Sequence, residues 1–189
     1  MKKLLAFLTA TASVSGAAYS DNILVIEVAG ESRGKVEIAL FSDVAPQHVE
    51  RITTLATAGE YDGVVFHRVI DGFMAQTGDV RFGDWTNDGV NPRVGTGGSD
   101  LPDLPAEFSE IPFTKGTVGM ARTQDPNSAN SQFFIMFEDA PHLNGQYTVV
   151  GQVTSGQDVV DAIKKGPPPN GMISENPGYM ERVEVRQAN

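Results

Sequence analysis

The chain has 189 residues, of which 40% are hydrophobic and 20% are charged, values that are ordinary for one globular domain with a substantial core. Its 14 basic and 24 acidic residues give a formal net charge of −10, which argues against nucleic acid as a main partner because phosphate binding requires a basic surface. The chain contains no cysteine, so no disulfide framework holds the fold.

The first 20 residues have the three-part pattern of a secretory signal peptide. Two lysines precede a short apolar run over 4–14, which is followed by small residues, and the run is shorter than the roughly 20 residues that span a bilayer. Cleavage after Ala18 or Ser20 satisfies the small-residue requirement, and we expect it near Ser20 and Asp21. The prediction is a mature domain over 21–189, periplasmic or secreted, without stable membrane insertion. An uncleaved amphipathic N-terminus is the alternative.

Strand-like segments begin directly after this leader. The segments 22–28 and 34–41 have strand composition, and the second alternates clearly, with Val36, Ile38 and Leu40 on one face. Shorter strands are expected at 66–70, 73–77, 117–121, 133–137, 147–153 and 179–186.

Two helices are predicted between these strands. Ser42 or Asp43 can cap the first, Pro46 suits its first turn, Gly59 ends it, and its apolar stripe comprises Val49, Ile52, Leu55 and Ala56. The second lies in "SGQDVVDAIKKG". Ser155 and Asp158 fit a capping pattern, and Gly166 ends the helix. Its apolar stripe comprises Val159, Val160 and Ile163.

Many short strands with two isolated helices indicate an all-β-dominated fold, either a small closed β-barrel or a sandwich, with the helices covering open ends. The region from Val80 to Lys115 has weak periodicity and many Gly, Pro and Asp residues, so it is predicted to be surface loop.

Ordinary catalytic motifs are weak in this chain. The histidines His48, His67 and His142 lie far apart without cysteine or an HExxH pair, so no metal site and no cofactor are expected. "GTGG" at 95–98 lacks the lysine and Ser/Thr of a phosphate-binding loop and is predicted to be a tight turn. No GxSxG elbow is present. A metal-dependent hydrolase would require His67 and carboxylates to converge.

The remaining candidates are apolar and amide side chains around one cation. Phe73, Met74, Phe134 and Leu143 could line a shallow apolar pocket, Gln76, Gln132 and Asn130 could hold a peptide backbone, and Arg68 would supply a fixed charged donor. Each also has an ordinary structural interpretation: one of two adjacent phenylalanines should face the core, methionines often fill core gaps, and Gln132 could be an exposed loop residue.

Five segments in register resemble the cyclophilins, the peptidyl-prolyl cis–trans isomerases: "FHRVIDGFMAQTGD", "GTGG", "GMAR", "NSANSQFFI" and "HLNGQYTVVGQV". The similarity runs from about Ile23 to Val185. It implies an eight-stranded antiparallel barrel closed by two helices, with a peptide site on its outer surface. Matched by motif, the catalytic residues are Arg68, Phe73 and Gln132, and the substrate-binding residues are Met74, Gln76, Ala121, Arg122, Phe134, His142, Leu143 and Tyr147.

Three features depart from this resemblance. Tyr147 stands where many relatives have histidine, and His142 stands where relatives sensitive to cyclosporin have tryptophan, so weak cyclosporin binding is expected. About ten residues between Asp79 and Gly95 are inserted relative to compact relatives. Trp85, the only tryptophan, lies there and is expected to anchor the loop on the barrel, with contact to extended substrates as the alternative.

One local pattern conflicts with a single pocket. A two-residue turn at Asp71-Gly72 would pair Arg68 with Ala75, so that Arg68 and Phe73 share a face while Gln76 points the other way. A bulge, twist or wider turn would then be needed to bring these residues together.

The function expected from the resemblance is rotation of X-Pro peptide bonds in exported proteins, carried out by a monomer whose partners are proline-containing polypeptides. The alternative is a non-catalytic proline-peptide binder or chaperone that uses the same groove.

Overall fold

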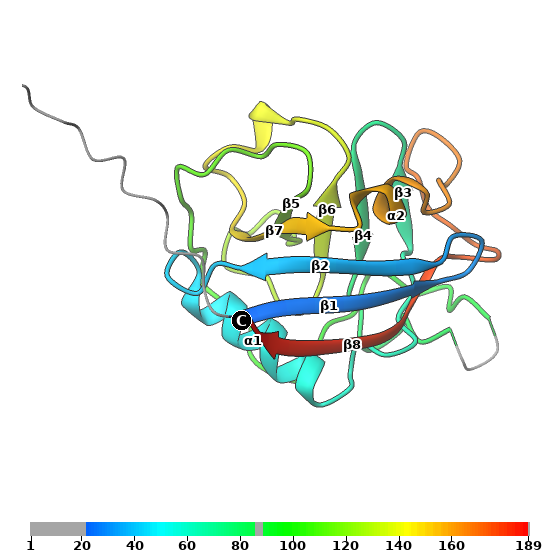
Figure 1. The fold of residues 1–189 in the computed structure, drawn as a ribbon, viewed down its shortest axis with the longest axis horizontal. Coiled ribbons are helices and arrows are strands. Elements are labelled where there is room, and N and C mark those ends of the chain that lie inside the picture. The colour runs from blue at the N-terminus through cyan, green and yellow to red at the C-terminus, as the bar shows by residue number, and fades with distance from the viewer. Residues whose placement is uncertain (1–21, 86–88, 189) are drawn as a thin grey trace, which may run out of the picture.

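The computed structural model describes residues 22–85 and 89–188, so the predicted signal peptide lies outside the described residues. Eight strands form one antiparallel sheet (Figure 1). Each predicted strand is confirmed, and no strand end differs by more than two residues from the prediction. The strands are β1 Asn22–Ala29, β2 Gly34–Leu40, β3 Arg68–Ile70, β4 Met74–Thr77, β5 Thr117–Met120, β6 Phe133–Met136, β7 Val149–Ser155 and β8 Tyr179–Gln187.

The sheet curls into a half-barrel with the strand order β3-β4-β6-β5-β7-β2-β1-β8. Register shifts where β1 meets β8 and where β7 meets β2 and β5 increase the local twist. β3 and β8 form the two edges of this ladder. The segment 63–66 spans the gap between them, since the Gly63 N–H donates to Met180 O at 2.7 Å and the Phe66 N–H donates to Gly178 O at 2.8 Å. The predicted barrel is therefore confirmed only as an eight-stranded antiparallel half-barrel.

The first helix, α1 (Pro46–Thr57), packs against β8 (Figure 1). Its predicted apolar stripe is confirmed, and Pro46 occupies its first turn as expected. The predicted cap at Ser42 or Asp43 is wrong, because the N-cap residue is Ala45, which has no side-chain acceptor. The N-terminus of this helix is therefore stabilised by packing of its apolar face and not by a capping side chain.

The second helix, α2 (Gln157–Asp161), is shorter than predicted and packs against β2. It begins after Gly156, which has the left-handed φ of 82°, and not at a Ser155 cap. A glycine tolerates this φ without the steric cost of a Cβ atom. A 3₁₀ turn, η1 (Pro141–Leu143), follows β6 and precedes β7.

Two apolar clusters lie on opposite faces of the strands β4, β5 and β6. The main core, inside the curl, includes Ala75, Phe133 and Ile135 together with the buried face of α1. The second cluster includes Met74 and Phe134, which lie one position along the same strands. Because side chains alternate along a strand, neighbouring residues supply the core and the outer face in turn. The outer cluster positions the site described below.

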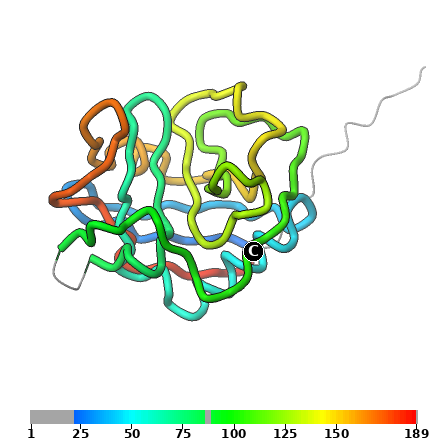
Figure 2. The backbone as a smooth tube through the Cα atoms, turned by 180° about the vertical axis from the view of Figure 1, so that it is seen from behind, coloured from blue at the N-terminus to red at the C-terminus, as the bar shows by residue number. Residues whose placement is uncertain are grey.

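The long segment between β4 and β5 forms loops, as predicted (Figure 2, green). Its first part is anchored on the segment before β3: the Trp85 N–H donates to Gly63 O at 2.9 Å, and the Val65 N–H donates to Gly83 O at 2.8 Å. These backbone bonds hold the start of the loop on the barrel, and the role expected for the Trp85 side chain stays a prediction.

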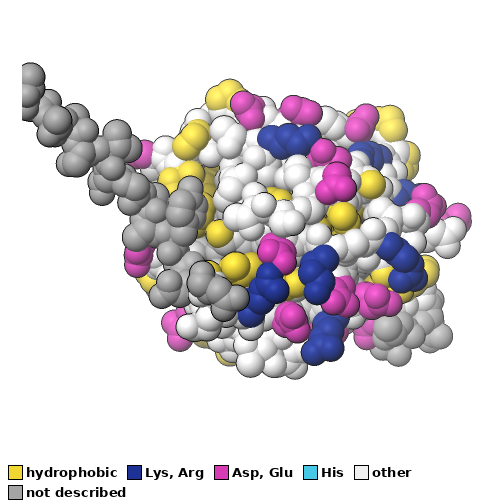
Figure 3. All heavy atoms as spheres, viewed as in Figure 1, with side chains coloured by type: hydrophobic (Ala, Val, Ile, Leu, Met, Phe, Trp, Pro, Cys, Tyr) yellow, Lys and Arg dark blue, Asp and Glu magenta, His cyan; other side chains and the backbone are white. Residues whose placement is uncertain are grey.

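Acidic and basic side chains are interspersed on the face formed by β1, β2 and β8 (Figure 3). Lys35 Nζ lies 3.3 Å from Glu27 Oε1, Arg182 Nη2 lies 3.7 Å from Glu184 Oε2, and Arg186 pairs with Glu37. Within 22–85 and 89–188, none of the helices combines the length and the apolar character needed to cross a bilayer.

Candidate active site

A small hollow of about 120 Å³ opens on the outer face of the sheet. Nine residues line it, and they come from sequence positions as far apart as 68 and 147. All nine are among the predicted site residues, so the fold brings most of that set together. They are Arg68, Phe73, Met74, Gln76, Ala121, Arg122, Phe134, Leu143 and Tyr147.

The turn between β3 and β4 decides which side chains reach the small hollow. The two-residue turn is not formed, and the wider turn that a single pocket requires is present, because the ladder pairs Arg68 with Gln76 and leaves the three residues 71–73 in the turn. A one-residue shift of register moves side chains to the other face of a strand. Gln76 therefore shares the face of Arg68. Gly72 permits the turn with a φ of 67°.

Adjacent phenylalanines of β6 face opposite ways. Phe133 is fully buried in the main core, edge-on to Tyr61 with ring centroids 5.6 Å apart. Phe134 faces outward, stacked on Phe113 at 5.7 Å and edge-on to Tyr147 at 5.7 Å. Aromatic pairs favour these separations and orientations. The outward cluster therefore gives the small hollow a rigid apolar wall.

Hydrogen bonds orient the cation of the small hollow from two sides. Arg68 Nε donates to Asn170 O at 3.1 Å, and Arg68 Nη1 donates to Gln76 Oε1 at 3.3 Å. Gln76 Nε2 in turn donates to Gln132 Oε1 at 2.9 Å. Each amide uses its oxygen as acceptor and its nitrogen as donor, so the bonds fix the orientation of both amides. Gln132 thus contributes from beside the small hollow and not from its lining.

A buried carboxylate supports this arrangement from behind. Asp79 is fully buried, and its Oδ2 accepts hydrogen bonds from the N–H groups of Gly95 at 2.7 Å and Gly97 at 2.9 Å. The carbonyl groups of the same glycines accept from Gln132 Nε2 at 3.1 and 2.7 Å. No role was predicted for Asp79 from the sequence. Its position after Gly78, ahead of a glycine-rich turn, is the signal that could have indicated one.

The rim beyond β5 is formed by the two predicted edge residues. The Ala121 N–H donates to Gln132 O at 2.9 Å. The Arg122 guanidinium carbon lies 4.4 Å from the centroid of the Tyr147 ring, and its Nη2 donates to Gln146 O at 2.8 Å. A guanidinium over an aromatic face is held by attraction to the ring quadrupole.

His142 differs from the other predicted residues. It is exposed on η1 and does not line the small hollow, whereas the adjacent Leu143 is buried and does. Its ring stacks on Phe73 with centroids 5.8 Å apart. His142 therefore adds an aromatic ring beside Phe73, at the rim of the small hollow and outside its lining.

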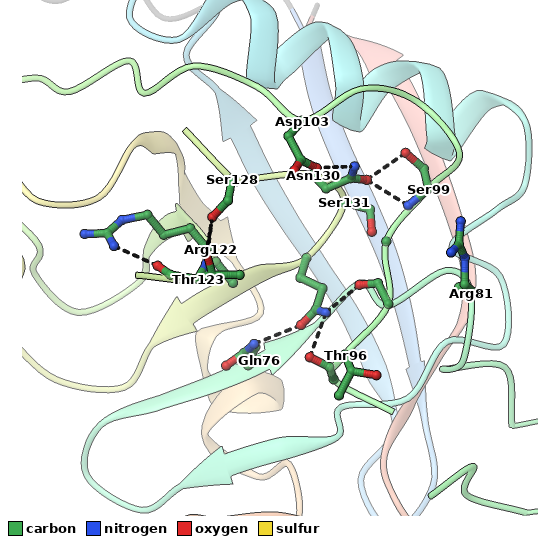
Figure 4. A pocket seen from close by; sticks show the side chains of 15 residues that line it. Gln76, Arg81, Thr96, Ser99, Asp103, Arg122, Thr123, Ser128, Asn130 and Ser131 are labelled. Carbon is green, nitrogen blue, oxygen red and sulfur yellow. Dashed lines mark hydrogen bonds between the residues drawn. The ribbon is translucent and has the colours of Figure 1, made fainter. Parts of the chain in front are cut away.

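A large hollow of about 580 Å³ adjoins the small one and shares Gln76, Ala121 and Arg122 with it (Figure 4). Loops between β4 and β6 build most of its wall, including the segment 95–98; the turn predicted there lies over 92–95 instead. Asn130, which was expected to hold a peptide, instead holds the wall: its Oδ1 accepts from the Ser99 N–H at 2.7 Å. This second hollow was not predicted from the sequence.

His67 lies buried behind the glycine turn of the large hollow. Burial lowers the pKa of His67 to about 4, and the nearby Asp79 carboxylate opposes this shift while the Arg68 charge reinforces it. The His67 ring is therefore neutral near pH 7. Among the residues that the structure describes, no three His, Cys, Asp or Glu side chains are grouped to hold a metal ion.

Known proteins are similar to this chain in sequence and in fold. The family model "Cyclophilin type peptidyl-prolyl cis-trans isomerase/CLD" matches residues 23–187. A Brucella suis protein named "Probable peptidyl-prolyl cis-trans isomerase" is 54% identical over 171 residues, covering 90% of this chain and 86% of the relative. The peptidyl-prolyl cis–trans isomerase CYP23 of Arabidopsis thaliana is 35% identical, covering 72% of this chain and 58% of its own.

Solved structures agree in fold. A cyclophilin from Hirschia baltica superposes with a TM-score of 0.68 at 29% identity, covering 86% of this chain and 73% of its own. A Cryptosporidium parvum cyclophilin-type isomerase, crystallised in the presence of the dipeptide Ala-Pro, gives a TM-score of 0.72 at 22% identity. The match covers 87% of this chain and 99% of that protein's chain. With the family model matching nearly the whole described region, the chain belongs to the cyclophilin-type peptidyl-prolyl cis–trans isomerases.

Proposed function

We propose that the small hollow holds the proline ring of an X-Pro peptide and that Arg68 catalyses rotation of the preceding peptide bond. Phe73, Met74, Phe134 and Leu143 supply apolar walls for the ring. Gln76 and Gln132 orient the guanidinium and the peptide backbone, and Ala121 with Arg122 forms the edge along which the peptide lies. The Ala-Pro dipeptide present with the Cryptosporidium parvum relative supports this class of ligand.

The chemistry needs no nucleophile, metal or cofactor. Conjugation between the proline nitrogen and the carbonyl group makes rotation slow, with a barrier of about 20 kcal/mol. As the bond twists, the nitrogen becomes pyramidal and regains a lone pair that can accept a hydrogen bond. A guanidinium at that position stabilises the twisted state more than the planar state, which is the condition for catalysis.

Arg68 accounts for part of the acceleration. A 10⁵-fold increase corresponds to about 7 kcal/mol, and a charged hydrogen bond contributes roughly 1.5–3 kcal/mol. Positioning of the peptide and exclusion of water by the apolar walls must supply the remainder.

The observation that carries this proposal is the placement of Arg68, whose guanidinium is held by Asn170 and Gln76 at the wall of an apolar hollow. We expect Arg68→Ala to lower kcat/KM by about 10- to 100-fold in a protease-coupled isomerisation assay, as loss of one charged hydrogen bond predicts. Arg68→Lys should restore only part of the rate, because an ammonium lacks the planar donor fork.

Arg33→Ala serves as the matched control, since Arg33 is an exposed arginine whose nearest carboxylate, that of Glu181, lies 3.9 Å away. Circular dichroism would establish that each variant is folded. An active wild type with unchanged kcat/KM in Arg68→Ala would exclude the proposed role. A wild type that binds proline peptides without isomerising them would favour the alternative of a non-catalytic binder or chaperone.

We further propose that the protein acts as a monomer on exported polypeptides in the periplasm or outside the cell, after cleavage near Ser20 and Asp21. The lysines, apolar run and small residues of the first 20 positions support this location. N-terminal sequencing of the protein from fractionated cells of its source would test it. An intact Met1 in the cytoplasmic fraction would contradict export. Light scattering would measure the molar mass in solution and so test whether the protein is a monomer.

A further inference from the structure

The charged residues around the two hollows have the opposite balance to the whole chain. The chain has 24 acidic and 14 basic residues, yet the charged residues that line the hollows are three arginines and one aspartate. These residues are Arg68, Arg81, Arg122 and Asp103. The groove is therefore a local basic surface on an acidic protein.

Two of these arginines have no carboxylate partner among the described residues. Arg68 donates to a carbonyl and an amide oxygen. Arg122 donates to the carbonyl oxygens of Gln146 and Thr123, and it stacks on the Tyr147 ring. Neutral acceptors satisfy donors without cancelling the charge. The basic side chains of β2 and β8 described above, in contrast, each lie beside a glutamate (Figure 3).

The remaining charged residues of the lining, Arg81 and Asp103, leave the net charge around the hollows positive. Arg81 pairs with Asp100, but the Asp100 side chain is 96% exposed, so water screens the pair and a ligand carboxylate can replace it. The Asp103 carboxylate accepts a hydrogen bond from Asn130 Nδ2 at 2.9 Å. Asp100 and Asp103 are thus two carboxylates beside three arginines, and Arg68 and Arg122 keep neutral acceptors only.

Arg81 and Arg122 lie on opposite sides of the large hollow (Figure 4). The Arg122 side chain extends away from the middle of that hollow, and Arg122 also lines the small hollow. A peptide whose proline occupies the small hollow and whose neighbouring residues cross the shared edge would therefore pass Arg122 first and Arg81 further on.

We propose that this enzyme prefers X-Pro peptides with a carboxylate side chain within two residues of the proline, on the side that lies over the large hollow. Arg122 and Arg81 are the specificity-determining residues. This preference rests on the proposed placement of proline in the small hollow. The net charge of −10 gives no such advantage to a carboxylate distant from the groove, because the rest of the surface repels it.

The test compares kcat/KM for matched peptides in which Glu or Gln is placed two residues before or two residues after the proline. We expect one of the two placements to favour Glu by about fivefold at low salt, since an exposed ion pair has an effect of this size. The preference should shrink in 0.5 M NaCl because of screening. A Glu placed six residues from the proline is the control of equal charge and should give no preference.

The variants use the Glu-to-Gln ratio of kcat/KM as their readout. Arg122→Gln should reduce the preference, and the double variant Arg81→Gln/Arg122→Gln should abolish it. Arg122→Lys should keep most of it. Arg182→Gln on β8 changes the net charge equally and lies in the sheet face away from the groove, so its ratio should match that of wild type. Equal rates for Glu and Gln at both placements, or a preference that persists in the double variant, would overturn the proposal.

Failure of the proposed function would look different. In that case the Gln peptides themselves would not be isomerised, whatever their charge. Calorimetric binding of the Glu and Gln peptides would then still test whether Arg122 and Arg81 select a carboxylate.

Discussion

The small hollow and the large hollow meet at Gln76, Ala121 and Arg122 but are built from different parts of the chain. Several walls of the small hollow are side chains of strands and of η1, and Met74, Phe134 and Leu143 are themselves buried. The packing that forms this hollow also stabilises the domain. Its shape therefore follows from the fold with little additional support.

The large hollow depends on polar groups instead. Its wall is formed by loops whose backbone groups require partners when they are removed from water. Asp79 and Asn130 provide those partners through their side-chain oxygen and nitrogen atoms. A polar wall of this kind is more sensitive to the loss of one side chain than an apolar wall, because several backbone donors lose their acceptor at once.

The largest expected effect of this difference is at Asp79. Its carboxylate accepts hydrogen bonds from four backbone N–H groups, those of residues 81, 82, 95 and 97. Asp79→Ala should lower the free energy of unfolding by about 4 kcal/mol, because four partly buried backbone donors would lose their charged acceptor at once. Urea denaturation would measure the loss.

Asp100→Ala is the matched control, since that carboxylate is exposed and should change stability by less than about 0.5 kcal/mol. Asp79→Ala should also lower kcat/KM at a temperature where it remains folded, because Gln132 is held by the same glycine turn. A stability within 1 kcal/mol of wild type would mean that the large hollow does not depend on this carboxylate.

The same difference explains what the sequence could predict. The predicted strand positions and apolar stripes were correct, because the alternation of side chains along strands and the periodicity of helices are visible in the sequence itself. Short-range motifs also identified Phe134 and Leu143, whose side chains the small hollow uses. The width of the turn over 71–73 could not be decided from the sequence, because Asp-Gly suits a two-residue turn whereas a single pocket requires a bulge, twist or wider turn.

The large hollow could not be predicted in this way. Its residues join a loop over 79–103 to one over 121–132, and loop pairing of this length leaves no periodic signal. Asn130 was interpreted as a ligand-binding amide, because the sequence shows that the side chain can donate and accept hydrogen bonds but not which groups it bonds. The structure shows those partners to be Ser99, Leu101 and Asp103.

A smaller effect, through pH, is expected at His67 behind the wall of the large hollow. Its pKa of about 4 in the folded protein lies below the ordinary value of 6.5. The unfolded chain therefore binds more protons between these values, and stability is lost as pH falls from 6.5 to 4. The shift corresponds to about 3 kcal/mol. Unfolding measured across this range should show that loss in wild type and a flatter profile in His67→Gln. Identical profiles would show that protonation of His67 does not weaken this wall.

The smallest effect is expected at the rim of the small hollow. His142 stacks on Phe73 but lies outside the lining, so His142→Trp should change kcat/KM by less than about twofold. The indole adds apolar surface and points its N–H donor in a different direction from imidazole, and one neutral hydrogen bond of about 1 kcal/mol predicts about fivefold tighter cyclosporin binding by calorimetry. His142→Ala, which lacks a donor, should not tighten binding. A large loss of activity in His142→Trp would mean that the substrate contacts the rim as well as the hollow, and the apolar site would then extend past Phe73.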